Sequence, residues 1–412
     1  MSRNFTVLGA GIVGVCTALA LQREGWAITL VDRDEPGRGC SFGHAGIIHS
    51  GGCIPLATPG ILGAVPGMLL DPEGPLVIRW RSLPRLLPWL VKLMVASRPA
   101  RFEAACRALA PLALAARDAF LPILKEAGTD DVMRSRGELY VYRTRRAFEA
   151  AGWEMDLRGR YGIPVEHFEA DALRDMEPAL SPAYRYAHYL PASAFVVNPL
   201  RLVSSLAALL VRKGGRIVRA EVRGARPDGA GGAVLVTAEG ELRAENLAIC
   251  AGAFSRPFAT SFGARVPLET LRGYHIMVPS GIVHLNGVVI DGNLHFGVTP
   301  MEEGIRVAGL IELASLDAPP RYARAELFLK LAQELIPGFP SEATSRWMGH
   351  RPGMPDSVPV IGRAPRHRNV YLAFGHGQLG LTFGAVTGQL VADLAAGRAS
   401  TIDMAPYRPE RF

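Results

Sequence analysis

The residues with the clearest chemical meaning lie near the N-terminus, where Gly9, Gly11 and Gly14 form the pattern G-x-G-x-x-G. This pattern follows an apolar stretch of strand type and begins a helical one, as dinucleotide-binding turns do. The first glycine permits the tight turn, the second lets a pyrophosphate approach the backbone, and the third allows close helix–strand packing. Asp32 ends the next apolar strand, where its carboxylate can accept the ribose hydroxyls. This setting favours a dinucleotide site over a plain tight turn.

The N-terminal pattern does not separate FAD from NAD, but two later segments favour FAD. Residues 248–253 form an apolar strand that ends in the small residues Ala251 and Gly252, where backbone can pass close to a bound dinucleotide. Residues 375–382 form a second glycine-rich turn between a strand and a helix. The N-terminus of that helix can stabilise negative charge on the pyrimidine end of a reduced isoalloxazine. A soluble nicotinamide would need no such second anchor.

Parallel βα units are expected at both ends of the chain, with antiparallel strands between them. Residues 5–8, 12–24 and 27–31 predict a strand, a helix and a strand, with Gly25 as the C-cap of the helix. This order predicts an α/β fold, α+β overall, in which a nucleotide-binding domain made of separated segments carries a β-rich insertion. The other predicted strands are 137–142, 184–190, 216–222, 233–237, 242–250, 274–278, 288–290, 294–298, 305–310 and 370–374, and the other helices are 200–213, 324–334 and 382–396.

Composition narrows the class of protein. The 412 residues suggest two domains, and 49% apolar with 20% charged residues indicates a globular chain. The net charge of +7 is scattered, which argues against nucleic-acid binding but favours anionic substrates or membrane surfaces. The five cysteines contain no CxxC pair, so we expect a reducing compartment and neither a disulfide framework nor a metal site. His44 and His49 lack the spacing and partners of a metal pair.

The sequence predicts a cytoplasmic protein, or one that contacts the inner face of the cytoplasmic membrane peripherally. The N-terminus leaves no room for a signal-peptide core before the first strand, and no uninterrupted apolar run approaches the roughly 20 residues of a spanning helix. Residues 61–125 are expected to be mostly helical with proline breaks. Within them, the apolar stretch 83–95 has basic flanks. A core-facing helix pair is the preferred interpretation, and a membrane-surface helix that would meet a quinone is the alternative.

These segments together resemble the D-amino-acid oxidase/dehydrogenase (DAO) superfamily of FAD enzymes over essentially the whole chain. The nearest likeness is to the bacterial D-amino-acid dehydrogenase small-subunit group, which includes D-hydroxyproline dehydrogenase-like members. The most specific segment is 347–362, with Arg351-Pro352 and Pro359-Val360-Ile361-Gly362. The other segments that carry the resemblance are 9–14, 41–46, 251–253, 272–275 and 375–382.

The resemblance implies a glutathione-reductase-like Rossmann FAD domain and a β-rich substrate domain inserted into it. The expected FAD domain comprises residues 1–60, 148–258 and 345–412, and the expected substrate domain comprises residues 61–147 and 259–344.

The resemblance further implies that residues 41–47 run along the flavin and that Val222 lies by the adenine half. His44 occupies a position that is usually Asn in the family, which can alter flavin tuning or substrate choice. No cysteine follows Arg351 where sarcosine-oxidase relatives attach their flavin, so FAD is expected to be noncovalent. The residues expected to contact FAD are Gly9, Gly11, Ile12, Val13, Gly14, Asp32, Arg33, Ser41, His44, Ala45, Gly46, Ile47, Val222, Ala251, Gly252, Gly375, Gln378, Leu379, Gly380, Leu381 and Thr382.

The chemistry that the resemblance implies is hydride transfer from the α-carbon of a neutral amine to flavin N5. In the family the arginine of the Arg-Pro pair grips the substrate carboxylate, and a planar guanidinium suits that task because it donates two parallel hydrogen bonds. Tyr274 is interpreted either as a second donor to the carboxylate or as a core tyrosine. A histidine can help to keep the amine deprotonated. The expected site residues are Arg351, Tyr274, His44 and His376 for catalysis, with His275, His295 and Gln378 also lining the substrate pocket.

The expected activity is FAD-dependent dehydrogenation of a D-amino or D-imino acid, with D-proline or hydroxyproline as the first candidates. Electrons would pass to a quinone, the respiratory chain or another acceptor. The alternative is an oxygen-using oxidase of the glycine or sarcosine type, and no residue decides between them. A third hypothesis is a noncatalytic or RNA-acting flavoprotein, which predicts a contiguous basic surface and no arginine over the flavin.

Overall fold

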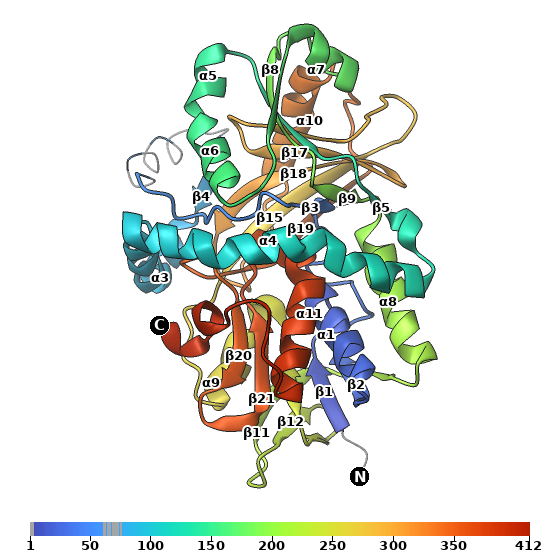
Figure 1. The fold of residues 1–412 in the computed structure, drawn as a ribbon, viewed down its shortest axis with the longest axis vertical. Helices are drawn as coiled ribbons and strands as arrows, with labels where there is room; N and C mark the ends of the chain where they lie inside the picture. The colour runs from blue at the N-terminus through green and yellow to red at the C-terminus, as the bar shows by residue number, and fades with distance from the viewer. Residues whose placement is uncertain (1–3, 61–62, 64–66, 68–73, 75) are drawn as a thin grey trace.

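The computed structural model describes residues 4–60, 63, 67, 74 and 76–412 of the chain. Figure 1 shows two parts stacked along the long axis, with the long helix α4 (Pro99–Ala127) lying across the middle. The N-terminal strand lies in the lower part, and α10 (Ala323–Leu335) lies in the upper part. Each part is built on its own sheet.

The sheet of the lower part is mostly parallel. The chain adds strands first to one side of β1 and later to the other, so the carboxyl end of β1 is a switch point of the kind where open α/β sheets bind their ligands. Its strands, in spatial order, are β10 (Arg216–Arg219), β2 (Ala27–Asp32), β1 (Asn4–Leu8), β14 (Leu247–Ile249), β21 (His367–Phe374) and β20 (Val360–Ala364), of which only β20 is antiparallel to its neighbour.

Helices and a small sheet cover the lower sheet. The largest core cluster joins apolar residues of β1 and β2 to α4 and to the helices α1, α8 and α11. A second cluster joins β14 and β21 to α9 and a three-stranded sheet. The bounds of these elements are α1 (Ile12–Arg23), α8 (Pro199–Arg212), α9 (Ser255–Ser261), α11 (Gly380–Ala396), β11 (Val222–Pro227), β12 (Ala233–Thr237) and β13 (Glu241–Ala244).

Glycines let α1 and α11 approach each other very closely. A Cβ at Gly388 of α11 would lie 2.6 Å from the backbone of Cys16 in α1, and a Cβ at Gly384 would lie 2.9 Å from the side chain of Ile12. The N-terminal and C-terminal helical segments are therefore packed backbone against backbone.

The segment Gly377–Ala396 has the length and mean hydropathy of a membrane span, which the sequence interpretation did not anticipate. Its most apolar stretch is 67% buried inside the protein, where α11 packs against α1 and α4. Burial in the core accounts for the apolar composition of this segment.

The sheet of the upper part is largely antiparallel and packs one face on α10 through a third core cluster. Its other face lines the cavity described below. In spatial order its strands are β19 (Ser345–Gly353), β15 (Glu269–Val278), β18 (Gly304–Leu313), β17 (Phe296–Met301), β16 (Val288–Asp291), β6 (Glu138–Tyr142), β8 (Tyr186–Leu190) and β7 (Glu166–Glu169), with β4 (Leu76–Ile78) added beside β18.

A second three-stranded sheet is formed by short segments that are far apart in the chain. Strand β9 (Ala194–Val196) pairs with β3 (Ile47–Ile48) on one side and with β5 (Met133–Arg134) on the other. The remaining helices are α3 (Leu83–Ala96), α5 (Arg145–Ala150), α6 (Gly152–Arg160) and α7 (Ala170–Met176).

The predicted fold class is confirmed, but several boundaries differ. Strands β7, β8 and β19 pair within the upper sheet, whereas the predicted division assigned residues 148–258 and 345–412 to the FAD domain. The predicted strand 242–250 is two strands, β13 and β14, which belong to different sheets.

The prediction of proline breaks is wrong for α4, which continues through Pro111 and Pro122. A buried apolar stripe holds this helix and offsets the backbone hydrogen bonds that the prolines remove. Most of the predicted helical stretch before residue 76 lies outside the described residues.

Helix α3 combines features of both interpretations of residues 83–95. Leu86 and Trp89 are buried in a small core cluster, as a core-facing helix requires. Leu87 and Val91 of the same helix are 55% and 44% exposed. Among the described residues, the helix therefore also presents apolar side chains to the surface.

The contact between α1 and α11 can be tested with Gly388→Ala. Alanine favours the helix, but its Cβ would meet backbone that cannot rotate away, so we expect a net loss of about 1–3 kcal/mol in the free energy of unfolding. Chemical denaturation measures the change. The matched control is Gly152→Ala in α6, where a Cβ meets nothing within 4 Å. Equal stability of the two variants would contradict the packing argument.

Candidate active site

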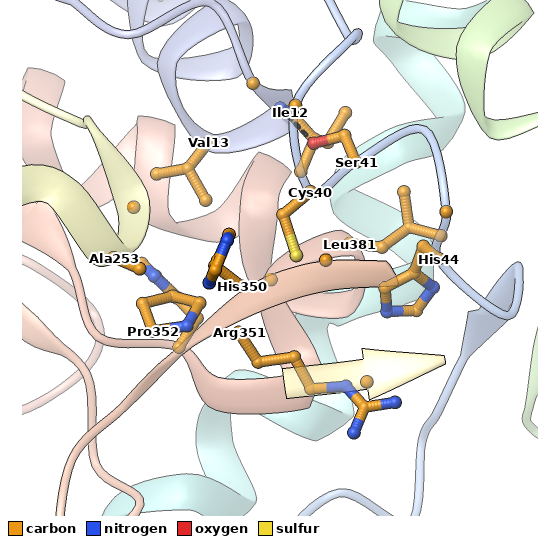
Figure 2. A pocket seen from close by; sticks show the side chains of 18 of the residues that line it. Ile12, Val13, Cys40, Ser41, His44, Ala253, His350, Arg351, Pro352 and Leu381 are labelled. Carbon is orange, nitrogen blue, oxygen red and sulfur yellow. Dashed lines mark hydrogen bonds between the residues drawn. The ribbon is translucent and has the colours of Figure 1, made fainter. Parts of the chain in front are cut away.

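A cavity of about 770 Å³ lies between the carboxyl ends of the lower strands and the open face of the upper sheet. Its lining runs from Leu8 and Asp32 at the dinucleotide turn to Gly273 and Gly309 on the upper sheet. Figure 2 shows Ile12 and Ser41 beside the start of α1, with Cys40, His44 and Arg351 around the same cavity.

The first glycine turn has the shape that a dinucleotide phosphate requires. Gly9 has φ +108°, and a Cβ there would lie 2.4 Å from the carbonyl oxygen of Cys250. A Cβ at Gly14 would collide with the carbonyl of Gly9, so this third glycine sets the close packing of helix on turn. The first turn of α1 carries no acidic side chain, which leaves its N-terminus available to an anion.

Asp32 stands where the ribose is expected. Its Oδ2 accepts a hydrogen bond of 2.6 Å from the backbone N–H of Ala10, which holds the carboxylate against the turn. The carboxylate keeps further lone pairs for hydroxyl groups. Arg33 and Val222 line the same end of the cavity, and the Arg33 guanidinium lies 4.4 Å from the ring centre of Phe254. These residues fit the adenosine half of FAD.

The loop of residues 40–47 is attached to both glycine turns. Ser41 Oγ accepts a hydrogen bond of 3.0 Å from the backbone N–H of Ile12, as Figure 2 shows. Gly46 has φ +82°, and a Cβ there would lie 2.6 Å from the carbonyl oxygen of Val196. The hydroxyl of Thr382 in α11 donates to the carbonyl of Ile47 at 3.2 Å.

The second glycine turn brings the start of α11 to the cavity. Gly375 and Gly377 have φ values of +86° and +57°, a conformation that favours glycine. Residues 376–382 all line the cavity, and the first turn of α11 carries no acidic side chain. A helix N-terminus in this position fits the predicted electrostatic support for the pyrimidine end of the flavin.

His44 is held in one neutral form by its neighbours. Its Nδ1 accepts from the backbone N–H of Gly46 at 3.1 Å, so Nε2 carries the proton and donates to the carbonyl of Gln378 at 2.9 Å. Burial, together with the charges of Arg351 and Arg306, lowers the pKa of His44 to about 4. With both ring nitrogens engaged, His44 joins the loop of residues 40–47 to the turn before α11 and is unsuited to proton transfer.

Arg351 lies across the upper sheet with its guanidinium in the cavity wall. Nη1 donates to the carbonyl of Leu310 at 2.8 Å, and Nη2 lies 3.5 Å from the carbonyl oxygen of Gly309. A Cβ at Gly273 would lie 2.2 Å from Cζ, so the absence of a side chain there makes room for the guanidinium. No ion pair joins Arg351 to a carboxylate among the described residues, and burial lowers its pKa.

A second buried arginine, Arg306, has a different position. Its Nη1 donates to the carbonyls of Phe42 at 3.1 Å and His44 at 2.6 Å, and burial lowers its pKa to about 10. Arg306 is not among the cavity-lining residues. It lies behind the loop of residues 40–47 and fixes the backbone of that loop. Sequence reasoning missed this residue, since an arginine inside an alternating strand carries no recognisable signal.

The polar groups of two predicted pocket residues have partners inside the protein. Tyr274 lines the cavity, but its hydroxyl donates its hydrogen to Glu312 at 2.5 Å and accepts from the N–H of Arg321, so it has no donor left for a substrate carboxylate. His275 is 1% exposed and is not among the cavity-lining residues, and its Nδ1 lies 3.0 Å from the carbonyl oxygen of Gly43. Of the two interpretations of Tyr274, the geometry favours the core tyrosine, and His275 supports the loop of residues 40–47 from behind the cavity wall.

The other predicted residues lie at the cavity. His295 and Gln378 line it, and His376 lines it with Nε2 at 3.0 Å from the hydroxyl of Thr387. Burial lowers the pKa of His376 to about 3, so it is neutral at physiological pH. Of the residues expected to contact FAD, all line the cavity except Gly14, Gly46 and Gly375, which shape the backbone behind it.

The cavity also contains residues that the sequence interpretation did not select. Cys40 lies near Arg351, and burial raises the pKa of its thiol to about 11, which keeps it protonated. His49, Glu138 and Tyr140 form a group in the cavity wall, several strands away from Arg351. Among the described residues no group of three His, Cys, Asp or Glu side chains could hold a metal ion.

The sequence profile of the FAD dependent oxidoreductase (DAO) family matches residues 4–394. The chain belongs to this family. It is therefore an FAD-dependent oxidoreductase, and the glycine turns and Asp32 border a cavity in the place where the sequence predicts the dinucleotide site.

Named relatives extend the comparison. The chain is 36% identical to a D-amino-acid oxidase of Bradyrhizobium diazoefficiens, over 100% of this chain and 99% of the relative. It is 30% identical to a D-amino acid dehydrogenase of Agrobacterium fabrum, over 97% of both chains. These relatives support an enzyme that acts on amino acids, as predicted.

Solved structures share the fold. Glycine oxidase from Geobacillus kaustophilus superposes with a TM-score of 0.77 at 21% identity, covering 100% of both chains. L-proline dehydrogenase from P. horikoshii superposes with a TM-score of 0.76 at 17% identity, covering 100% of this chain and 98% of the other. At these identities the likeness concerns the fold alone.

The buried histidines make stability depend on pH. Burial lowers the pKa of His275 and His376 to about 3, and that of His44, His188 and His350 to about 4. Between these pKa values and the unfolded value of about 6.5, the unfolded chain binds more protons than the folded chain. The contribution of these histidines to stability is therefore fully present above about pH 6.5 and is lost as the pH falls through the folded pKa values. Each histidine contributes at most about 1.4 kcal/mol per pH unit.

Denaturant titrations of the yellow protein at neutral and mildly acidic pH measure this dependence. His188→Gln removes one of these groups away from the cavity and should flatten the slope, whereas His284→Gln at an exposed position should not. A stability that does not change between about pH 7 and pH 5 would contradict the assignment.

Proposed function

We propose that the chain dehydrogenates a D-amino or D-imino acid, with Arg351 as the ligand of the substrate carboxylate. The observation that carries the proposal is a largely buried guanidinium, without a carboxylate partner among the described residues, in the wall of the cavity that the glycine turn also lines. A buried cation without an anion is unfavourable, and a carboxylate ligand removes that cost.

The same surroundings favour the reactive form of the amine. His44 and His376 are neutral. The charged groups that act on His44 are the guanidinium groups of Arg351 and Arg306. A positive potential in a poorly hydrated cavity disfavours an ammonium group, so the substrate nitrogen loses its proton more readily. When bound, FAD supplies the hydride acceptor; the residues of this chain bind the carboxylate, orient the α-carbon and exclude water.

The substrate and its configuration are inferred from the relatives. Two relatives with D-amino acids in their names match almost the whole chain, which supports the D series. D-Proline and hydroxyproline are the first candidates, and the flavin is expected to be noncovalent. A cytoplasmic location is part of the proposal, with a quinone or another respiratory acceptor taking the electrons.

An oxidase that uses oxygen is the second candidate. The observation that favours it is the 36% identity to a relative named as an oxidase, which exceeds the 30% identity to the relative named as a dehydrogenase. The difference is small, and the cavity residues named above do not discriminate between acceptors.

Arg351→Ala tests the carboxylate ligand. Loss of a buried charge-assisted pair should lower kcat/KM for the best D-amino acid by about 10²- to 10³-fold, while the yellow cofactor is retained. Arg346→Ala on the same strand is the matched control, because its guanidinium is exposed and pairs with Glu326. Anaerobic flavin bleaching measures both. Wild-type turnover by the Arg351 variant would refute the assignment.

An oxygen pulse separates the two candidates. The enzyme is first reduced by a D-amino acid without oxygen, and the return of flavin absorbance is then followed after oxygen is added. For a dehydrogenase we expect slow reoxidation and little peroxide, with rapid reoxidation on adding a soluble quinone. Rapid reoxidation with stoichiometric peroxide would instead establish the oxidase.

A further inference from the structure

The cavity contains a second polar group, made by His49 and Glu138, that the function described so far does not use. Nδ1 of His49 is hydrogen-bonded to Oε1 of Glu138, which also accepts from the hydroxyl of Ser193 at 3.1 Å. The Glu138 side chain is fully buried and that of His49 is 16% exposed, and both line the cavity. The pair joins residues 89 positions apart in the chain.

The pair lies across the upper sheet from the carboxylate ligand. Leu139 and Val141 of β6 are buried in the core beneath the sheet, so Glu138 and Tyr140 face the cavity by alternation. The Arg351 guanidinium rests on β18, and β17 and β16 separate that strand from β6. Three strand spacings correspond to about 14 Å across the sheet. The register places Glu138 in the row of Arg306, four residues before Leu310, which adds about 13 Å along the strands. Only an amino acid with a long side chain, bound at Arg351, can therefore direct the end of that side chain toward the pair.

The atoms of the pair that remain free are hydrogen-bond acceptors. Oε2 of Glu138 is buried and has no partner among the described residues. In the tautomer in which Nδ1 of His49 donates to the carboxylate, Nε2 is also an acceptor, and no hydrogen bond to it is found among the described residues. A buried acceptor without a donor costs free energy, which a ligand with a donor group recovers.

A buried arginine lies near the pair. Arg158 is 4% exposed, lies with its guanidinium 5.7 Å from the ring centre of Tyr140, and is paired with Glu154 at 3.1 Å. Its positive field reaches the buried carboxylate, and the Tyr140 ring forms the wall beside His49, with ring centres 6.4 Å apart. The pair is thus a buried polar site in a cavity whose lining is more apolar than polar.

We propose that His49 and Glu138 form a side-chain subsite that selects substrates whose side chain ends in a hydrogen-bond donor, either a hydroxyl or an ammonium group. The inference rests on the proposed function, because Arg351 must hold the carboxylate at the other end. Amino acids with a long side chain and a polar end are the substrate class that this arrangement fits. Aliphatic amino acids of the same length leave both acceptors without a partner.

Three D-amino acids of equal length test the subsite: D-2-aminoheptanoate, 6-hydroxy-D-norleucine and D-lysine, which end in a methyl, a hydroxyl and an ammonium group. The holoenzyme is mixed with each without oxygen, and the rate of flavin bleaching is measured as a function of concentration. For the wild type we expect kcat/KM for at least one donor-ended compound to exceed that for the methyl compound by about tenfold or more.

Glu138→Gln should remove most of that preference while changing the rate with the methyl compound less than about twofold. His49→Gln is the second variant, in case the first does not fold. Glu154→Gln is the matched control, because it removes a neighbouring carboxylate that does not line the cavity. Retained flavin absorbance and an unchanged melting temperature show that each variant is folded.

The outcomes separate this proposal from the function on which it rests. If short D-amino acids bleach the flavin but the three long compounds do so equally, the subsite is refuted and the proposed function stands. If Glu138→Gln slows all three to the same degree, the pair has a structural role and the proposal also fails. If no amino acid bleaches the wild-type flavin, the proposed function itself is refuted.

Discussion

The arrangement of the cavity depends on placing a buried guanidinium where no carboxylate of the described chain can neutralise it. Arg351 can reach that position because β19, β15 and β18 lie side by side and because Gly273 has no side chain beneath it. Carbonyl oxygens of β18 accept its hydrogen bonds, which fixes its orientation without cancelling its charge. The protein therefore keeps a positive charge without a carboxylate partner in the cavity wall, which is the basis for proposing that an anionic substrate binds there.

A second constraint is the position of the loop of residues 40–47, which contacts from several neighbouring elements fix. Arg306 and His275 contact its carbonyl oxygens from the upper sheet, and Ser41 and Thr382 join it to the starts of α1 and α11. Several groups that resemble catalytic residues by type thus serve to position backbone. Rigid support of this kind is what hydride transfer requires, since the reacting atoms must be held within a narrow range of distance.

Local patterns predicted the parts of the site that depend on neighbouring residues in the chain. The glycine turn, Asp32 and the second turn before α11 could be recognised because each is a short segment with a fixed chemical requirement. The position of Arg351 at the cavity followed from a resemblance and agrees with the geometry. The two interpretations of Tyr274 could not be separated from the sequence, because a register shift between Arg272 and Tyr274 and the buried partner Glu312 decide where its hydroxyl points.

Pairs formed across the fold were beyond sequence reasoning. His49 and Glu138 have no pattern in common, and only the pairing of β6 with β16, and of β3 with β9, brings their segments to one cavity. Helix α4 shows the same limit for backbone structure, because tertiary packing maintains it through two prolines that local rules treat as breaks.

The intimate contact between α1 and α11 has a mechanical consequence for the cavity. The glycine turn before each helix contributes to the cavity wall, although the two turns are far apart in the chain. Because the Cβ of an alanine at position 388 would collide with the backbone of Cys16, neither helix can slide along the other without a clash. The two turns are therefore coupled, and a displacement of one would be transmitted to the other.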